Sequence, residues 1–187
     1  MTEDIKKACQ VLWEGGVILY PTDTIWGLGC DATNAAAVKR VYDIKQRADS
    51  KAMLVLVDSP VKVDFYVDEV PDIAWDLIEL TEKPLTIIYP GARNLASNLL
   101  AEDGSVGIRV TKEKFSHRLC QQFRKAIVST SANISGAPSP ATFAEISPEI
   151  LEAVDYVVSL RQEETGKPRP SGIIKLGKGG LIEVIRE

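Results

Sequence analysis

The chain has 187 residues, of which 45% are hydrophobic and 26% are charged, a composition typical of a soluble globular protein whose core needs no disulfides. Its 22 basic and 26 acidic residues give a net charge of −4, which argues against binding to bulk polyanions but leaves room for a local basic pocket. Three widely spaced cysteines without a CxxC pair argue against a disulfide framework or a zinc site. There is no signal-peptide pattern and no apolar run near the roughly 18 residues of a membrane span. We therefore expect one cytoplasmic domain over residues 1–187, with no membrane partner.

Short apolar runs alternate with amphipathic segments along the chain. The first helix is predicted to begin with Thr2 as its cap and to end at Gly15 and Gly16. Strands are expected at 17–20, 52–57, 85–89, 105–111, 126–130, 156–160, 171–176 and 180–186, and further helices at 34–47, 72–83 and 112–125. This alternation predicts an α/β fold, and the closing run of strands predicts a mixed sheet. The polar stretch 161–172 is predicted to be a surface loop.

Several familiar catalytic patterns are missing from the sequence. It contains no GxxxxGK[ST] phosphate loop, no GxSxG elbow and no HExxH helix. The single histidine, His117, falls within an amphipathic helix beside Arg118, which favours a helix-surface or partly packed side chain over a catalytic one. Nucleophilic catalysis by a Ser–His or Cys–His pair is therefore disfavoured, and any chemistry should depend on positioning and electrostatics.

Polar residues gather in the stretch YPTDTIWGLGCDA, which follows the first predicted strand. Thr22, Asp23 and Thr24 come at the C-terminal end of that strand, where open α/β sheets bind ligands. The glycines of the stretch are expected to let the backbone turn beneath a ligand. Trp26 is expected to form a wall of the site, with a plain packing role as the alternative.

Cationic residues occur at two further places. Lys45, Arg47 and Lys51 lie at or just past the end of the helix predicted at 34–47, where they either complement the helix dipole or bind an anion. Arg109 sits in the apolar strand VGIRVT. Because a buried arginine needs an anionic partner, either a structural carboxylate or a ligand is expected beside it.

Hydroxyl groups dominate the stretch VSTSANISGAPSP at 128–140, and Ser171 opens a later strand. Small hydroxyls and backbone N–H groups in such an arrangement suit phosphate or ribose oxygens, although an ordinary Ser/Asn-rich turn has the same composition. Together these residues predict a cationic, hydroxyl-lined site for an anionic ligand such as a nucleotide. The residues alone leave the reaction open.

Five segments in this order resemble the YrdC-like family of threonylcarbamoyl-adenylate synthases. They are YPTDTIWGLGCDA, IKQRADSKAMLVLV, VGIRV, STSANISGAPSP and PSGIIKL, and the resemblance extends from about Gly15 to Arg186 in its short, single-domain form. It implies a twisted mixed sheet with flanking helices around a concave basic cavity. It also implies synthesis of threonylcarbamoyl-AMP and pyrophosphate from L-threonine, bicarbonate and ATP with Mg²⁺, for modification of tRNA by downstream transferase proteins.

The resemblance assigns roles to individual residues. It implies catalytic roles for Lys45 and Arg47, which would hold the ATP phosphates. Threonine would be bound by Thr24, Arg109, Ser129 and Ser171. The nucleotide would be bound by Lys45, Arg47, Lys51, Ser105, Ser131, Asn133, Ser139 and Arg186. No metal ligand in the protein is implied, because Mg²⁺ would be carried by the ATP phosphates.

Three positions depart from the family pattern. Trp26 replaces a usual tyrosine, Ala52 replaces a common proline, and Gly172 replaces a common threonine. The last change removes a hydroxyl near the implied site. Two alternatives are kept. The first is a non-catalytic protein of the same fold whose basic cavity binds tRNA or other structured RNA, which the net charge of −4 disfavours. The second is a paralogue with a different carbamoyl or acyl-adenylate chemistry.

Overall fold

A mixed sheet of nine strands runs through the molecule in the order β7-β1-β2-β6-β3-β5-β4-β8-β9. The computed structural model describes residues 1–47, 52–166 and 168–187. The strands are β1 Ile18–Tyr20, β2 Gly27–Gly29, β3 Leu54–Val57, β4 Leu85–Tyr89, β5 Val106–Val110, β6 Ile127–Ser131, β7 Tyr156–Val157, β8 Gly172–Leu176 and β9 Ile182–Arg186. The pairs β1/β7, β3/β5 and β4/β8 are parallel, and the others are antiparallel. The predicted mixed α/β fold is confirmed.

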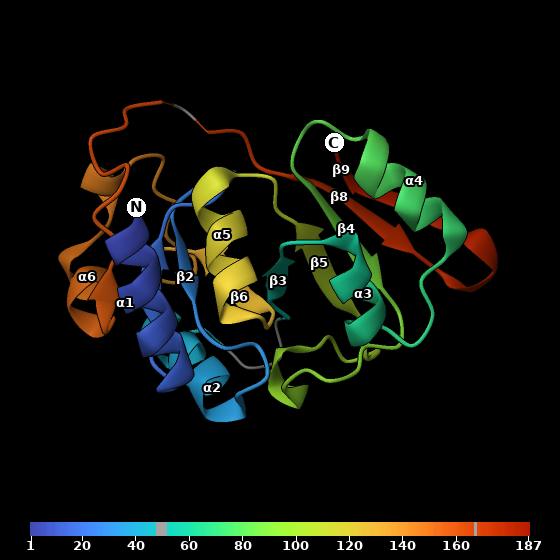
Figure 1. Cartoon of the computed structure of the whole chain (residues 1–187), viewed down its shortest axis with the longest axis horizontal. Helices are drawn as coiled ribbons and strands as arrows, with labels where there is room; N and C mark the ends of the chain where they lie inside the picture. The colour runs from blue at the N-terminus through green and yellow to red at the C-terminus, as the bar shows by residue number, and fades with distance from the viewer. Residues whose placement is uncertain (48–51, 167) are drawn as a thin grey trace.

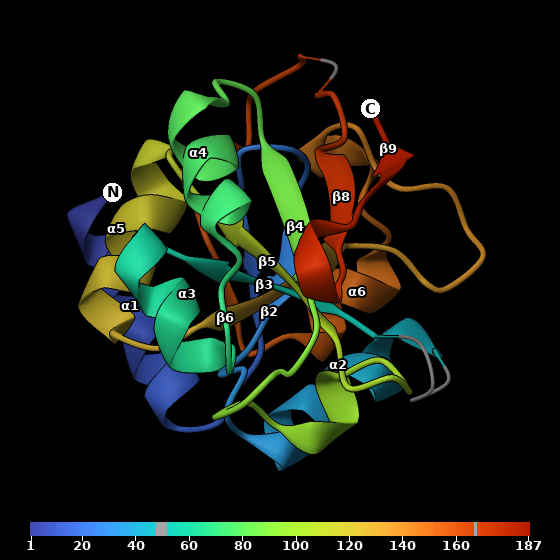
Figure 2. The same ribbon diagram turned by 90° about the vertical axis from the view of Figure 1, so that its right-hand side faces the viewer.

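Four helices cover one face of the central sheet (Figures 1 and 2), and the described residues leave the part of the opposite face around Arg109 open as a cleft. They are α1 Thr2–Trp13, α2 Ala35–Lys45, α3 Pro60–Tyr66, α4 Asp72–Leu80, α5 Lys114–Phe123 and α6 Pro148–Ala153. Helices α1, α3, α4 and α5 lie on the same side of the sheet (Figures 1 and 2). Because side chains alternate along a strand, Ile108 of β5 points toward this helical side and Arg109 points to the opposite face, where a cleft lies. No helix in the described part of the chain is long and apolar enough to cross a membrane.

The first helix buries the face that its sequence predicts, but its start differs from the prediction. Ile5, Ala8, Cys9 and Leu12 are all buried. Thr2 is the first helical residue and not the cap, because the helix begins one residue earlier than predicted and Met1 occupies the cap position without a side-chain bond. In place of a capping side chain, acidic residues in the first turn stabilise the helix by their interaction with the positive N-terminal end of its dipole.

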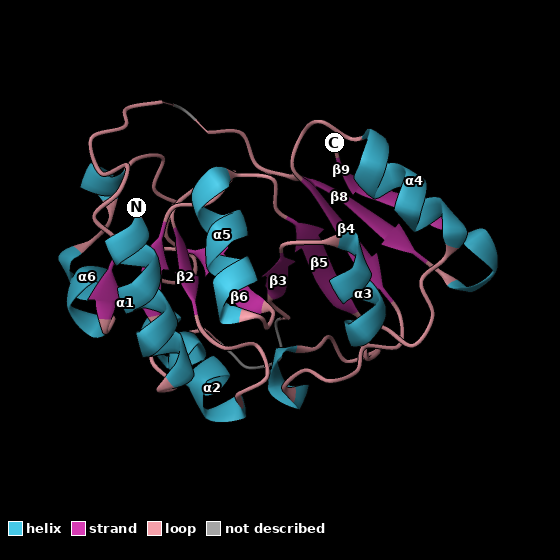
Figure 3. Ribbon diagram, in the orientation of Figure 1, coloured by secondary structure: helices cyan, strands magenta, loops and turns pink. Residues whose placement is uncertain are grey.

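Two short α-helices and one short strand were not expected from the sequence. Helices α3 and α6 have seven and six residues, too few for a clear helical period. Strand β2 has three residues, two of them glycine, and glycine is depleted in strands. Its pairing with β1 and β6 holds β2 in place (Figure 3). Residues 18–29 are therefore a pair of antiparallel strands joined by a polar loop.

The two glycines of β2 allow close approach, and the predicted backbone turn at these positions is wrong. Neither Gly27 nor Gly29 has a positive φ. A Cβ on Gly29 would lie 2.6 Å from the ring of Tyr20 and 2.9 Å from the carbonyl oxygen of Val128. The missing side chain therefore lets β1, β2 and β6 pack closely beneath the polar loop.

Replacing Gly29→Ala should lower the free energy of unfolding by about 1–3 kcal/mol, because the added methyl overpacks a rigid site. Urea unfolding measures this difference. Gly166→Ala is the matched control, since no atom lies within 4 Å of its Cβ position, and it should stay within about 0.5 kcal/mol of the parent. A Gly29→Ala protein as stable as the parent would contradict the proposed tight packing.

Candidate active site

A cleft of about 660 Å³ lies on the open face of the sheet, within the size range of small-molecule sites. Its walls come from the loop before β2, the segment after α2, strands β5 and β6, the 139–141 turn and the 168–173 segment. The charged side chains among its described lining residues are Arg47, Arg109 and Arg186. The cleft thus combines positive charge with hydroxyl groups, as the sequence predicts for an anionic ligand.

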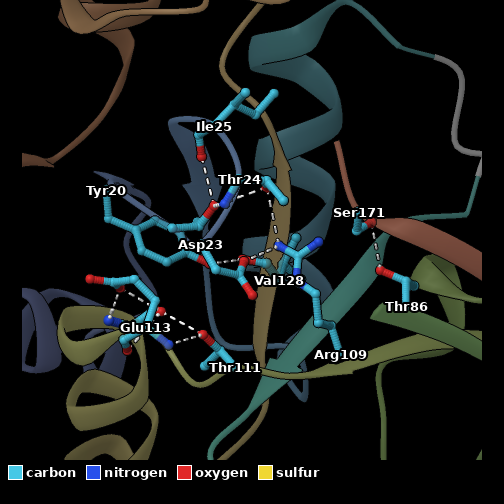
Figure 4. A network of polar contacts seen from close by, with 12 residues as sticks. Tyr20, Asp23, Thr24, Ile25, Thr86, Arg109, Thr111, Glu113, Val128 and Ser171 are labelled. Atoms are coloured by element: carbon cyan, nitrogen blue, oxygen red, sulfur yellow. Dashed lines mark hydrogen bonds and ion pairs between the residues drawn. The ribbon is translucent and has the colours of Figure 1, made fainter. Parts of the chain in front are cut away.

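Arg109 is the deepest of these arginines. Its side chain is 3% exposed, and its Nη2 lies 3.0 Å from Oδ1 of Asp23 and 3.5 Å from Oγ1 of Thr24. Figure 4 shows the three side chains converging from β5 and from the loop between β1 and β2. Burial lowers the pKa of Arg109, and the charge of Asp23 opposes this shift. The guanidinium still remains protonated, as arginines do in proteins.

The loop between β1 and β2 is shaped by hydroxyl bonds that hold Asp23 and Thr24 in position. Thr22 Oγ1 donates to the carbonyl of Ile25 over 2.7 Å and accepts from the backbone N–H of Thr24. The guanidinium of Arg161 also donates to the carbonyl of Thr22 over 3.0 Å. Burial raises the pKa of Asp23, with Arg109 acting in the opposite direction.

Ser171 and Arg186 form a second polar group in the cleft. Ser171 is buried, and its Oγ lies 3.1 Å from Oγ1 of Thr86 on β4. Arg186 Nε donates to the carbonyl of Ser171 over 2.8 Å. The C-terminal strand β9 therefore brings Arg186 to the site, and the parallel pairing of β4 with β8 places Thr86 beside Ser171.

Lys45 takes a different position from the other cations. It is 2% exposed and is not among the residues that line the cleft. Its Nζ donates to the carbonyl oxygens of Ser131 and Asn133, the latter over 2.8 Å. Burial, followed by the charge of Arg47, lowers the pKa of Lys45 to about 8. In this conformation the ammonium braces the turn that follows β6.

Arg47 stands at the rim of the same region. It is half-buried just past α2, and its Nη2 donates to the carbonyl of Ala52 over 2.8 Å. Its buried Nε has no hydrogen-bond acceptor among the described residues. Burial lowers the pKa of Arg47. A half-buried guanidinium with an unpaired donor on the cleft wall is suited to an anionic ligand.

Most of the predicted site residues lie together in the cleft. They are Thr24, Arg47, Arg109, Ser129, Ser131, Ser139, Ser171 and Arg186. Asn133 lies just behind the wall, where its Oδ1 accepts from Lys45 and its Nδ2 donates to the carbonyl of Ala137. Lys51 lies outside the described residues. Ser105 lies before β5 and away from the lining, where it donates to Asp103 over 2.5 Å, so its nucleotide contact stays a prediction.

Sequence reasoning did not assign several residues that shape the site. Thr86 is a polar residue within the apolar run LTIIY. A polar residue in a buried strand is the one feature of the sequence that could have indicated its place at the site. Arg161 bonds to Thr22 through a contact between distant parts of the chain that no local pattern predicts. Asp23 belongs to the predicted polar loop, but its pairing with Arg109 required the fold. Trp26 is buried and packs at a tilt against Phe143, with 4.9 Å between the ring centroids. It also lines the cleft, so it has both a packing role and a place in the cleft wall.

The side chains expected to be non-catalytic lie away from the cleft. His117 Nδ1 lies 3.1 Å from the carbonyl oxygen of Thr111 on the helical side of the sheet. All three cysteines are free and buried, and burial raises the pKa of Cys9 to about 11. Neither residue type offers an activated nucleophile at the site.

The family model Sua5/YciO/YrdC, described as "Telomere recombination", matches residues 10–187. The chain belongs to this family. It is 36% identical over 172 residues to a threonylcarbamoyl-AMP synthase of Pseudoalteromonas translucida, and the match covers 90% of this chain and 91% of that protein.

Solved structures show the same fold. E. coli YciO matches with a TM-score of 0.85 and 24% identity, over 100% of this chain and 90% of that chain. P. abyssi Sua5 in complex with L-threonine matches with a TM-score of 0.82 and 24% identity, over 92% of this chain. The chain spans 50% of that Sua5 chain. The expected YrdC-like fold is confirmed.

The stability of this family member should depend on pH through Lys45. Its folded-state pKa of about 8 lies below the ordinary lysine value of 10.5, so the unfolded chain binds more protons between these two pH values. Linkage then requires the contribution of Lys45 to the free energy of unfolding to rise with pH across this window.

Urea unfolding of the parent and of Lys45→Met at several pH values from 7 to 10 measures this effect. The difference in the free energy of unfolding between the two proteins should grow in favour of the parent above pH 8. A pH-independent difference would show that Lys45 keeps an ordinary pKa in the folded protein.

Proposed function

We propose that this protein is a threonylcarbamoyl-AMP synthase, an enzyme that transfers the adenylyl group of ATP to N-carboxythreonine. The observation that carries the proposal is the cleft in which three arginines and several hydroxyls converge, in a chain 36% identical to a protein of that name. A nucleotide triphosphate and an amino-acid carboxylate are both anionic, and both suit such a cleft.

The proposed division of the cleft has a nucleotide end and a threonine end, which meet where Arg186 bonds to the carbonyl of Ser171. Arg47 binds the ATP phosphates, and Ser131, Ser139 and Arg186 contribute to the nucleotide end. Lys45 and Asn133 support that end by fixing the turn after β6. Threonine lies at the other end. Its binding set is Thr24, Arg109, Ser129 and Ser171, while Lys51 and Ser105 stay predicted nucleotide contacts.

The proposed reaction needs no protein nucleophile. The threonine ammonium group first loses a proton to solvent, and the resulting amine combines with bicarbonate to form a carbamate and water. An oxygen of the carbamate then attacks the α-phosphorus of ATP, and pyrophosphate leaves. Positioning the two substrates and neutralising phosphate charge supply the catalysis for such a displacement. ATP enters as its Mg²⁺ complex, and the arginines of the cleft add to that neutralisation.

The biological setting follows from the proposed product. Threonylcarbamoyl-AMP is an activated acyl group, and we place its use in tRNA modification by separate transferase proteins in the cytoplasm. The alternative of a non-catalytic RNA-binding protein has less support, because the arginines discussed here converge inside a cleft, whereas affinity for structured RNA comes from an extended basic face.

Pyrophosphate release is the direct test of the proposed activity. Purified protein with Mg-ATP, bicarbonate and L-threonine should release pyrophosphate, and omission of either threonine or bicarbonate should abolish the release. Salt-sensitive binding of tRNA without any threonine-dependent pyrophosphate would instead support the RNA-binding alternative.

The variant Arg47→Ala should lower kcat/KM for ATP by about 10²–10³-fold, the cost of removing one charge-stabilising group. Its melting temperature should change little, because the side chain of Arg47 makes one described hydrogen bond, to Ala52, and the bond of its backbone N–H to Tyr42 is kept in the variant. Arg118→Ala, which removes an exposed arginine of α5, is the matched control and should keep full activity. A large loss of thermal stability in Arg47→Ala with little loss of kcat/KM would assign Arg47 a structural role at the helix end.

A further inference from the structure

The charges of the cleft leave one part of an amino acid without a partner. The described charged residues that line it are all arginines, which can bind a carboxylate or phosphates but repel an ammonium group. An α-amino acid carries its carboxylate and its ammonium group on adjacent atoms. A site that selects an amino acid over a simple carboxylic acid therefore needs an acceptor, best a carboxylate, beside the arginine that binds the acid group.

Asp23 is the carboxylate in that position. It lies beside Arg109, with 3.0 Å between Asp23 Oδ1 and Arg109 Nη2. Its side chain borders a hollow of about 280 Å³ that shares Thr24, Ile25 and Trp26 with the cleft. Glu164 borders the same hollow, but it is more than half exposed and already paired with Arg161.

The hydrogen bonds around Asp23 leave acceptor capacity unused. Its Oδ1 is buried and accepts no hydrogen bond of good geometry from the described residues, although Arg109 is near. Arg109 Nε is likewise buried without an acceptor. A buried ion pair with unused donors and acceptors on both partners is costly to the fold. A zwitterionic ligand would satisfy both partners at once.

We propose that Asp23 binds the α-ammonium group of the amino-acid substrate while Arg109 binds its carboxylate, so that the pair selects an α-amino acid. The inference rests on the proposed function, since it assumes that threonine is the substrate. The loop between β1 and β2 then sets amino-acid specificity, because Thr24 follows Asp23 directly and also contacts Arg109.

The decisive experiment compares threonine with 3-hydroxybutanoate, which is threonine without its amino group. Dissociation constants are measured by calorimetry for the parent, Asp23→Asn and Glu164→Gln. The parent and Glu164→Gln should bind threonine about 10–100-fold more tightly than 3-hydroxybutanoate, the range expected for one charge-assisted hydrogen bond. In Asp23→Asn, threonine should lose most of this advantage while 3-hydroxybutanoate binds as before.

Two results would overturn the inference. If Asp23→Asn lowers the affinity for threonine and for 3-hydroxybutanoate equally, Asp23 acts solely by holding Arg109. If the affinity for threonine is unchanged, Asp23 does not contact the substrate. Because Asp23→Asn could fail to fold, a second measurement uses the parent protein with ¹⁵N-labelled threonine. The pKa of the bound ammonium group should rise above its value in water beside Asp23, whereas a pKa lowered by Arg47, Arg109 and Arg186 would contradict the inference.

These outcomes are separable from those that test the proposed function. A parent protein that neither binds threonine nor releases pyrophosphate overturns the proposed function and this inference together. A parent that does both, with an Asp23→Asn variant that retains the full preference for threonine over 3-hydroxybutanoate, overturns this inference alone.

Discussion

The burial of one arginine in a strand organises the site. Arg109 lies in β5 with 3% of its side chain exposed, and a charge so placed is unfavourable unless anions surround it. The loop between β1 and β2 supplies Asp23 as the first anion, and the open face of the sheet leaves room for a ligand to supply a second. The fold thus keeps the positive charge of Arg109 at the base of the cleft, and the described residues supply acceptors for only some of its N–H groups.

The surrounding elements serve to hold this base in position. Gly29 lets β1, β2 and β6 approach closely, so the polar loop between β1 and β2 starts and ends on closely packed strands. Lys45 joins the end of α2 to the turn after β6 through backbone carbonyls. Both walls of the cleft are therefore fixed by buried contacts, and such fixed groups stabilise developing charge without reorganising during a reaction.

Several parts of this arrangement could be predicted from local pattern, and others could not. The buried faces of α1 and α2 follow from residues at helical spacing, and strands such as 85–89 follow from apolar runs. Strand β2 escaped prediction because glycine carries no strand signal, and it forms through pairing with its neighbours. Lys45 was expected at the phosphates, yet its long side chain is held by carbonyls 86 and 88 residues away.

The sequence by itself determined the residue types of the site, because an arginine within an apolar strand requires an anionic partner and hydroxyls at strand ends suit anionic oxygens. It also determined the mixed α/β class and the family. The tertiary structure alone decided which of these residues meet. Strands β6 and β3 lie between β2 and β5 in the sheet, and the loop between β1 and β2 reaches across them to bring Asp23 to Arg109. Ser105 is kept apart from the cleft by its place at the opposite end of β5 from Arg109. Charge pairing acts across space between residues far apart in the chain, so no local pattern contains it.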